Sequence, residues 1–437
     1  MLDSLRYTRA LLQVMHDGRL SPSRLERLAQ KRLKRVLTSA YLHVPYYRET
    51  MQAVGYNPLR DYRGPEDLQG LPVISRQVLK TEGRAAFVKE GIDLSNCARD
   101  ITSGSTGVPL VVYQSKYEHA VQAAKWLRVL FVNGYTGREK VMSLSILSKY
   151  PGQSTMIERF GPLERLAVSL RLPPEKIVDL LLDYRPEVLY GARTLLDLIA
   201  LELMRRGVQP KPLKLVIGAA EAIGAGSRRL CRQIFGTEML EVYGSVEMGG
   251  NIAYETGAHD GLHLCEDLIY FEFLDEEGEP VPPGKPGKVV LTDLTGDVMP
   301  FIRYDQGDWA VFEREGVHRN GRRRITRILG RDCDLVQLPD GTQRSFHSFA
   351  DIMHENDRIL QFRVVQKTPS LFHILVVAAP SYLLQIEEDL MGRLQARFPN
   401  TVRFEIIPVD RIEPDPSGKL RWLISEVEAT EKKDSGS

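Results

Sequence analysis

Between about residue 140 and residue 250, apolar runs alternate with helix-like segments, and this alternation constrains the fold more than any other feature. The runs KVMSLSI, PEVLYGA and LKLVIGAAE alternate with the helix-like PEKIVDLLLDYR, RTLLDLIALELMRRG and SRRLCRQIFG. Such alternation favours an α/β fold whose sheets are largely parallel. After about Gly257, apolar and polar residues alternate between turn signals, which predicts antiparallel strands.

The chain has 437 residues, and a prior of roughly 150 residues per domain gives two or three units. Near Arg331 the pattern restarts as a short α+β unit. We therefore predict a large N-terminal domain over residues 1–330, with mixed and parallel sheets and helices. A small α+β domain follows over residues 331–437 and carries Lys419.

The charge and the apolar pattern exclude several classes of protein. Because 58 basic residues nearly balance 57 acidic ones, no bulk field would attract nucleic acid or anionic lipid. The basic run from Gly321 to Arg327 fits a solvated turn and an edge strand. No stretch is apolar and long enough to span a membrane, and the N-terminus lacks a secretory h-region. The four scattered cysteines suit a reducing compartment, so we expect a cytoplasmic protein.

Five short segments stand out as candidate site segments. In chain order they are ITSGSTGVPLVV, EVYGSVEMGG, FIRYDQGDWA, ILGRDCDLV and PSGKLRW. Glycines and hydroxyls in the first can bring donors to phosphate oxygens, although it lacks the Lys of a Walker loop. In the second and third, Tyr243 offers a flat face, Glu247 a cation ligand and Asp308 a carboxylate for a ribose diol. Taken alone, the first segment fits a phosphate loop and an ordinary hairpin equally well, and the second, third and fifth fit an ordinary strand, turn or surface residue better than a site.

The order and spacing of the five segments resemble those of the adenylate-forming enzymes, which include acyl-CoA synthetases and luciferases. Within that superfamily the chain resembles the phenylacetate–CoA ligase family, including its capsular-polysaccharide-associated branch. HVPYYRE and LPVISRQVLK resemble N-terminal segments of the family, so the resemblance covers roughly residues 25–425. It implies that an acid attacks ATP to give an acyl-adenylate and pyrophosphate, and that coenzyme A then accepts the acyl group.

The resemblance also assigns roles to single residues. It places ATP phosphates at Thr102, Ser103, Gly104, Ser105, Thr106 and Gly107. It places adenine and ribose at Ala220, Glu221, Tyr243, Gly244, Ser245, Asp308 and Arg331. It makes Glu247 the Mg²⁺ ligand and Lys419 the mobile catalytic lysine, which gives these two residues the catalytic roles. It also implies that the small C-terminal domain is mobile.

The chain departs from the family pattern in three places. Cys333 stands where many relatives have the hinge Asp, and YGARTLLDL lacks the usual Pro-Ser of the acid-binding side. Some relatives carry a cysteine-rich metal site where this chain has His259, His263 and Cys265. Because tetrahedral zinc sites need four ligands, we expect no zinc here.

The acceptor of the acyl group leaves alternatives open. The chain is expected to use ATP, Mg²⁺, a small carboxylic acid and coenzyme A, as a monomer or homodimer without nucleic acid. A carrier protein or an amine is the alternative acceptor, and adenylylation of a small-molecule hydroxyl is an alternative reaction. A non-catalytic nucleotide-binding protein is the second alternative, against which the presence of Glu247 and Lys419 argues.

Overall fold

A single large mixed sheet organises most of the chain in this computed structural model, which describes residues 2–102, 110–145, 165–314, 323–331, 335–413 and 420–427. Its described strands run in the order β10-β11-β12-β13-β9-β8-β7-β6-β5-β3-β4. The parallel part contains β3 (Val141–Ser145), β4 (Arg165–Ser169), β5 (Val188–Ala192), β6 (Leu215–Ala219) and β7 (Met239–Ser245). The antiparallel part contains β8 (Gly250–Tyr254), β9 (Leu262–Leu264), β10 (Ile269–Leu274), β11 (Pro286–Asp293), β12 (Tyr304–Arg314) and β13 (Arg323–Arg331). Both parts match the sequence prediction.

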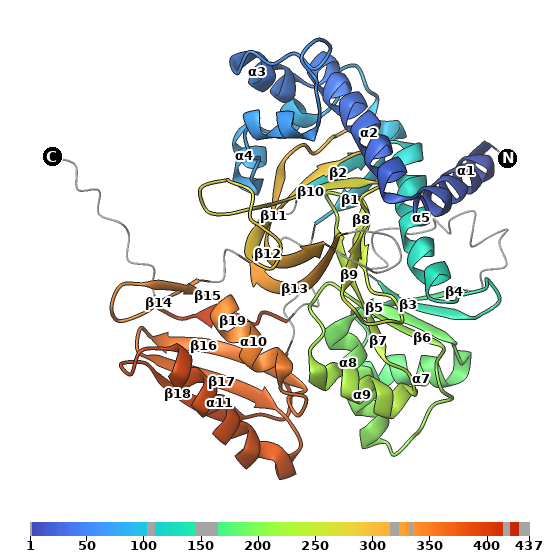
Figure 1. The fold of residues 1–437 in the computed structure, drawn as a ribbon. Helices are drawn as coiled ribbons and strands as arrows, with labels where there is room; N and C mark the ends of the chain where they lie inside the picture. Colours follow the sequence, from blue (N-terminus) through green and yellow to red (C-terminus); the bar gives the residue numbers. More distant parts are fainter. Residues whose placement is uncertain are drawn as a thin grey trace.

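Helices cover both faces of the parallel part, which confirms the predicted α/β class (Figure 1). One face packs against α7 (Pro174–Tyr184), α8 (Arg193–Arg205) and α9 (Ala225–Phe235). The other face packs against α5 (Lys116–Val132). Because a strand points alternate side chains to opposite faces, Leu189 joins the first apolar core and Val188 joins the second.

The N-terminal quarter packs helices on the antiparallel part of the sheet. It contains α1 (Leu2–Asp17), α2 (Pro22–His43), α3 (Pro45–Ala53), α4 (Arg76–Thr81) and the short helices η1 (Pro65–Gly70), η2 (Arg84–Phe87) and η3 (Leu94–Asn96). α2 ends before Pro45, because the residue before a proline is restricted to extended backbone, and Val44 has φ −118° and ψ 114°. The N-terminus of α4 is capped by Ser75, whose hydroxyl accepts a hydrogen bond from the Val78 amide.

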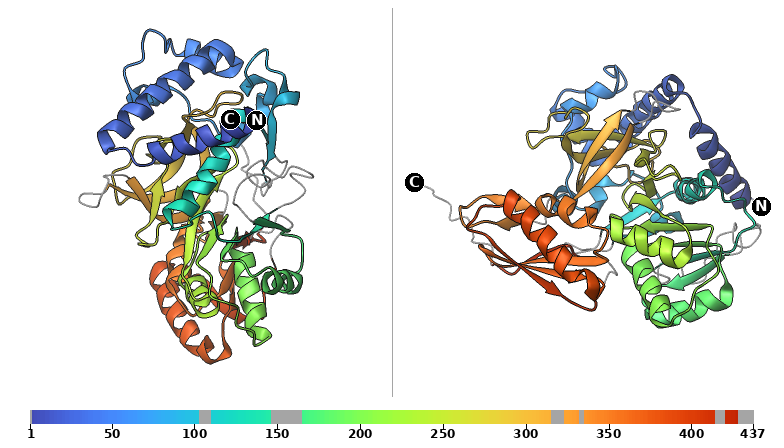
Figure 2. Two further views of the ribbon diagram at one scale, coloured as in Figure 1. Left: turned by 90° about the vertical axis from the view of Figure 1, so that its right-hand side faces the viewer. Right: turned by 60° about the horizontal axis from the view of Figure 1, so that its bottom comes forward.

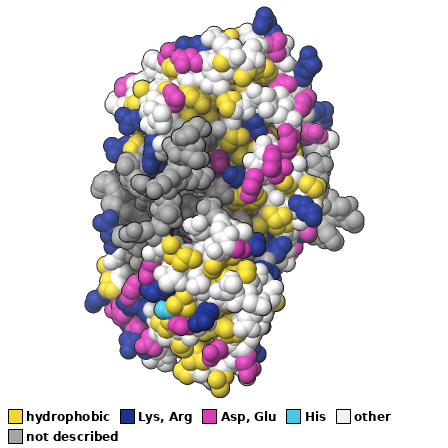
Figure 3. All heavy atoms as spheres, turned by 90° about the vertical axis from the view of Figure 1, so that its left-hand side faces the viewer, with side chains coloured by type: hydrophobic (Ala, Val, Ile, Leu, Met, Phe, Trp, Pro, Cys, Tyr) yellow, Lys and Arg dark blue, Asp and Glu magenta, His cyan; other side chains and the backbone are white. Residues whose placement is uncertain are grey.

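One strand lies elsewhere than the sequence indicated. Residues 323–327 of the basic run that we predicted as a turn and an edge strand lie within β13, which pairs with β12 on one side and with β9 on the other. The edge prediction is therefore wrong, because alternation alone cannot tell an edge strand from an inner one. On the face shown in Figure 3, basic and acidic side chains are interspersed. In the described part of the chain, no helix is long and apolar enough to cross a membrane.

The C-terminal part has a sheet and a core of its own. Its sheet has the order β18-β17-β16-β19 and is accompanied by the hairpin β14-β15. The elements are β14 (Leu335–Gln337), β15 (Gln343–Ser345), α10 (His347–Glu355), β16 (Gln361–Thr368), β17 (Leu371–Val377), η5 (Pro380–Tyr382), α11 (Leu383–Arg397), β18 (Arg403–Pro408) and β19 (Leu423–Ser425). Its separate apolar core includes the buried residues Phe349, Phe372 and Leu390. This part is therefore a smaller domain, as predicted.

The small domain lies beside α8 and α9 of the large one (Figure 2). A Cβ added at Gly226, in the first turn of α9, would lie only 1.7 Å from the Ile359 carbonyl oxygen. The Leu420 amide donates a hydrogen bond to the Glu221 carboxylate at 3.2 Å. The Arg193 guanidinium lies 4.7 Å from the centroid of the Trp422 ring. The two domains therefore meet through backbone contact, a hydrogen bond and a cation–π contact.

The close approach at Gly226 yields a prediction. Gly226→Ala would push the Ile359 carbonyl away, and an overpacked contact of this kind costs about 1–3 kcal/mol. We expect hydrogen exchange over residues 420–427 to accelerate by about tenfold, because about 1.4 kcal/mol corresponds to a factor of ten. Exchange in β6 and β7 should stay unchanged, as measured by mass spectrometry of the intact protein.

Gly392→Ala provides the matched control. Gly392 lies within α11, and an added Cβ meets no atom within 4 Å. Exchange over residues 420–427 should then stay at the wild-type rate. Equal exchange in the two variants would show that the close approach at Gly226 does not hold the domains together.

Candidate active site

The phosphate-loop segment begins at Thr102, the only one of its six predicted residues that the structure describes. The Thr102 hydroxyl accepts hydrogen bonds from the Leu110 amide at 2.9 Å and from Arg76 at 3.0 Å. On either side, β1 (Ala98–Ile101) and β2 (Val111–Gln114) form a two-stranded ladder that brings the ends of the segment together. Ser103, Gly104, Ser105, Thr106 and Gly107 lie outside the described residues.

The N-terminal family-like segment reaches this loop directly. Ile74 exchanges backbone hydrogen bonds with Arg303 and Asp305 on either side of Tyr304, and α4 starts immediately afterwards. This attachment places the Arg76 guanidinium on Thr102. Sequence analysis missed Arg76, although the resemblance of LPVISRQVLK to family segments was the available signal.

Tyr243 and Asp308 form the second part of the site. The Tyr243 hydroxyl donates a hydrogen bond to the Asp308 carboxylate at 2.7 Å, although 65 residues separate them. Both are nearly buried, with 9% and 7% of their surface exposed. Asp308 stands opposite Arg331 in the β12-β13 ladder, while the Arg331 side chain is outside the description. The structure thus brings the two predicted nucleotide contacts together.

Glu247 lies in the turn between β7 and β8. Its carboxylate accepts hydrogen bonds from the Ser245 hydroxyl and the Tyr304 hydroxyl, each at 3.0 Å. Burial raises the pKa of Tyr304, which keeps this phenol protonated as a donor. Lys125, buried on α5, supports the turn by donating to the Met248 carbonyl at 2.6 Å. Sequence analysis missed Tyr304, although it lies in the candidate segment FIRYDQGDWA.

The carboxylate set suits a magnesium ion on chemical grounds. Mg²⁺ prefers one or two carboxylates, together with phosphate oxygens and water, in octahedral geometry. Glu247 supplies one buried carboxylate, and two hydroxyls orient it. The residues present therefore fit a cation shared with a phosphate chain.

Ala220 and Glu221 follow β6 in an unusual conformation. Ala220 has φ +69°, a region that residues with a Cβ seldom occupy. The strained turn directs the Glu221 carboxylate to the Arg193 guanidinium at 2.7 Å and to the Thr194 hydroxyl at 2.5 Å. Glu221 is therefore engaged by α8 and by Leu420 of the small domain. Arg193 was missed as a site residue, although the absence of the usual Pro-Ser there was a signal.

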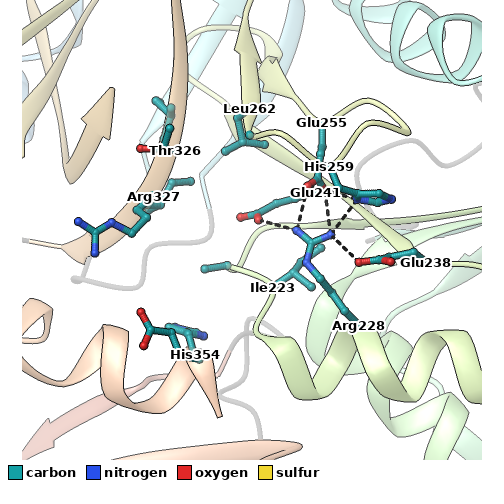
Figure 4. Close-up of a pocket in the computed structure, with 15 residues that line it drawn as sticks. Ile223, Arg228, Glu238, Glu241, Glu255, His259, Leu262, Thr326, Arg327 and His354 are labelled. Atoms are coloured by element: carbon teal, nitrogen blue, oxygen red, sulfur yellow. Dashed lines mark hydrogen bonds and ion pairs between the residues drawn. The ribbon is translucent and has the colours of Figure 1, made fainter. Parts of the chain in front are cut away.

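A cavity of about 390 Å³ opens beside these residues, between β7, β13 and α10. Arg228 lies at its centre among Glu238, Glu241 and Glu255, with His259 beside it (Figure 4). Burial raises the pKa of the Glu241 carboxyl to about 7. Glu241, which lines the cavity, stands two residues before Tyr243 on the same face of β7.

The three candidate zinc ligands contact different partners. His259 lies 3.3 Å from Glu255, His263 lies 3.0 Å from Asp260, and Cys265 is buried with the apolar core near Arg128. Among the described residues, no three His, Cys, Asp or Glu side chains are placed to hold a metal ion together.

Two further residues singled out from the sequence lie outside the described part of the chain. They are Lys419 and Cys333, which stands at the hinge position. Gly244 is exposed on the central strand β7, although its neighbours Tyr243 and Ser245 are buried. The Gly244 backbone is therefore accessible beside the Glu247 turn.

Two protein families match separate parts of the chain. Residues 97–295 match the AMP-binding enzyme family, and residues 339–426 match the CapK C-terminal domain.

Comparison with characterised proteins agrees with the geometry. The chain is 31% identical over 336 residues to a phenylacetate–coenzyme A ligase of Thermus thermophilus, covering 72% of each chain. It is 27% identical over 416 residues to the Aromatoleum evansii enzyme of that name, covering 91% of this chain and 86% of the other.

The structure also superposes on crystal structures of 2-hydroxyisobutyryl-CoA ligase, to which the chain is 19% identical. The TM-score is 0.78 for that ligase in a postadenylation state and 0.63 in a thioesterification state. Each superposition covers 93% of this chain and 91% of the other. The chain belongs to the phenylacetate–CoA ligase family of adenylate-forming enzymes.

Proposed function

We propose that this protein activates a carboxylic acid with ATP and transfers the acyl group to coenzyme A. The single observation that carries the proposal is the convergence of Tyr243, Asp308 and Glu247. The Tyr243 hydroxyl bonds the Asp308 carboxylate across 65 residues of chain. The Tyr304 hydroxyl bonds the Glu247 carboxylate across 57 residues. Family membership supports the same reaction.

The first step joins the acid to AMP. A carboxylate oxygen attacks the α-phosphorus of ATP, a new P–O bond forms, and the bond to the β-phosphate oxygen breaks to release pyrophosphate. The barrier arises mainly from crowded negative charge, so preorganised donors and cations lower it. We assign the phosphates to the loop that starts at Thr102, and Glu247 to a Mg²⁺ ion that would offset their charge.

The nucleoside would lie on the exposed side of β7. The adenine ring would stack on Tyr243, beside the cavity that Glu241 lines. Asp308 would exchange its Tyr243 hydrogen bond for the ribose diol, with Arg331 next to it in the ladder. Ala220 and Glu221 would form the wall of this site that faces the small domain.

The second step would use the mobility of the small domain. We place the domain boundary between residues 330 and 331, and we assign the role of mobile lysine to Lys419. The Leu420–Glu221 hydrogen bond supports this assignment, because it holds the residue after Lys419 against the nucleotide-site wall. Rotation of the small domain would then admit the thiol, which attacks the acyl carbonyl and releases AMP.

Pyrophosphate release tests the function. Carboxylic acids would be screened for ATP-dependent pyrophosphate release, with and without coenzyme A. Acid-dependent release followed by thioester formation is expected. A carrier protein or an amine would be indicated if release occurred but no thioester formed. No release with any acid would favour a non-catalytic nucleotide-binding protein. A cytoplasmic location and a monomer or homodimer stay predictions from the sequence.

The magnesium assignment gives one prediction. Glu247→Gln keeps the size of the side chain and removes its charge, so the Mg²⁺ concentration for half-maximal pyrophosphate release should rise. We expect a rise of at least about tenfold and a rate loss of about 10²-fold at limiting Mg²⁺, the scale of one preorganised group. Glu90→Gln, which removes a surface charge paired with Arg48, is the control. An unchanged Mg²⁺ dependence would remove Glu247 from the metal site.

Lys419 gives the second prediction. Lys419→Ala should reduce adenylate formation by about 10²-fold or more, because its ammonium would counter charge that develops in the transition state. ATP affinity should change little, since the nucleotide contacts lie in the other domain. Thioester formation from supplied acyl-adenylate should largely survive.

Two assays on the Lys419→Ala variant separate a role in adenylate formation from a structural role. Pyrophosphate release and thioester formation from preformed adenylate are compared for wild type and Lys419→Ala. Lys367→Ala is the control, because Lys367 lies in the same domain and pairs with Glu426 at the surface. Equal losses in both assays would indicate a structural role for Lys419, and no loss in either would make it a surface residue.

A further inference from the structure

Polar side chains gather where β3, β4, β5 and β8 approach α5. The Tyr190 hydroxyl donates to the Asn251 amide oxygen at 3.5 Å, and Ser143 stands opposite Tyr190 in the β3-β5 ladder. Arg165 donates to the Ser143 hydroxyl at 2.9 Å. Its guanidinium lies 4.9 Å from the Trp126 ring, which packs edge-on against Tyr190. We call these five residues the β5–β8 polar cluster.

The cluster lies beside the place proposed for the reacting phosphate. Asn251 stands opposite Gly244 in the β7-β8 ladder, and an added Cβ at Gly244 would lie 3.6 Å from the Asn251 amide oxygen. Gly244 is exposed, and the proposed magnesium ligand Glu247 follows three positions later in the chain. An acid whose carboxylate reaches the α-phosphate over Gly244 would therefore extend its chain toward Asn251 and Tyr190.

The Asn251 side chain has unused hydrogen-bonding capacity at this place. The residue is only 7% exposed, and its amide nitrogen has no hydrogen-bond partner among the described residues. Leaving a buried donor unpaired costs about 1–3 kcal/mol. Burial raises the pKa of Tyr190 to about 12, so the phenol beside it is also a donor.

We infer that the acid activated by this protein carries an oxygen acceptor on its chain or ring, as a hydroxy- or oxo-acid does. The acceptor would take a hydrogen bond from the Asn251 amide, next to the Tyr190 phenol and the positive charge of Arg165. The inference rests on the proposed function and concerns only its substrate class. An unsubstituted acid such as phenylacetate would leave the Asn251 donor buried and unpaired.

Matched acid pairs test the inference on the wild-type enzyme. Pyrophosphate release is measured with 4-hydroxyphenylacetate against phenylacetate and with 3-hydroxybutyrate against butyrate. A buried polar site discriminates strongly against an analogue that lacks the matching group. We therefore expect kcat/KM to be higher for the oxygenated member of at least one pair, by about tenfold or more. Equal or better use of both unsubstituted acids would overturn the inference.

Variants at Asn251 then test whether this residue causes the preference for the oxygenated acid. Asn251→Leu, similar in size, should bring the kcat/KM ratio of the preferred pair to within about threefold of one. Asn96→Leu is the control, because Asn96 lies in an exposed turn and bonds only Asp93 in the described structure. An unchanged ratio in Asn251→Leu would overturn the inference. Tyr190→Phe should lower the same ratio, which supplies a second variant if Asn251→Leu folds poorly.

The outcomes separate this inference from the proposed function. Acid-dependent pyrophosphate release without preference for the oxygenated members would leave the ligase function intact and refute the substrate class. Absence of release with every acid would refute the proposed function, and the inference would fall with it.

Discussion

The arrangement of the two domains depends on the interactions of one buried side chain, the Arg193 guanidinium. It is buried, with 1% of its side chain exposed, and it pairs with Asp197 at 2.8 Å and Glu221 at 2.7 Å. Removing one partner of such a buried pair typically costs about 3–5 kcal/mol, because the other charge is left uncompensated. The same guanidinium stacks on Trp422, so one charge connects α8, the turn after β6 and the small domain.

The nucleotide site depends in turn on the pairing of distant strands. The Tyr243 hydroxyl on β7 reaches the Asp308 carboxylate on β12 although β13, β9 and β8 lie between the two strands in the sheet order. Tyr304, on β12, reaches Glu247 in the turn after β7 in the same way. Lys125 holds the turn between β7 and β8 by donating a hydrogen bond to the Met248 carbonyl. This bond offsets the cost of burying the Lys125 ammonium. Rigid strands thus carry the groups that need accurate positions.

Much of the fold was predictable, because hydrophobic periodicity and capping residues act locally. The Ser75 cap and the end of α2 before Pro45 follow from single residues and their neighbours. The position of β13 inside the sheet was not predictable, since its basic residues find partners such as Glu266 and Asp260 on other segments. Local pattern gives the type of element, while the neighbours of a strand depend on contacts far away in the chain.

By itself, the sequence determined the order of the site segments and the types of residue that they carry, and hence the family. Only the tertiary structure decided which of those residues meet. Glu221 illustrates the difference: its place in a family segment predicted a nucleotide contact, and only the fold shows that its carboxylate also bonds Arg193, Thr194 and Leu420. Tyr190 begins the segment YGARTLLDL, whereas Asn251 lies in none of the predicted segments. They became a candidate acid-binding pair only because the fold brings the Tyr190 hydroxyl to the Asn251 amide, 61 residues away in the chain. The physical reason is that hydrogen bonds and ion pairs depend on distance and burial, which a linear pattern does not contain.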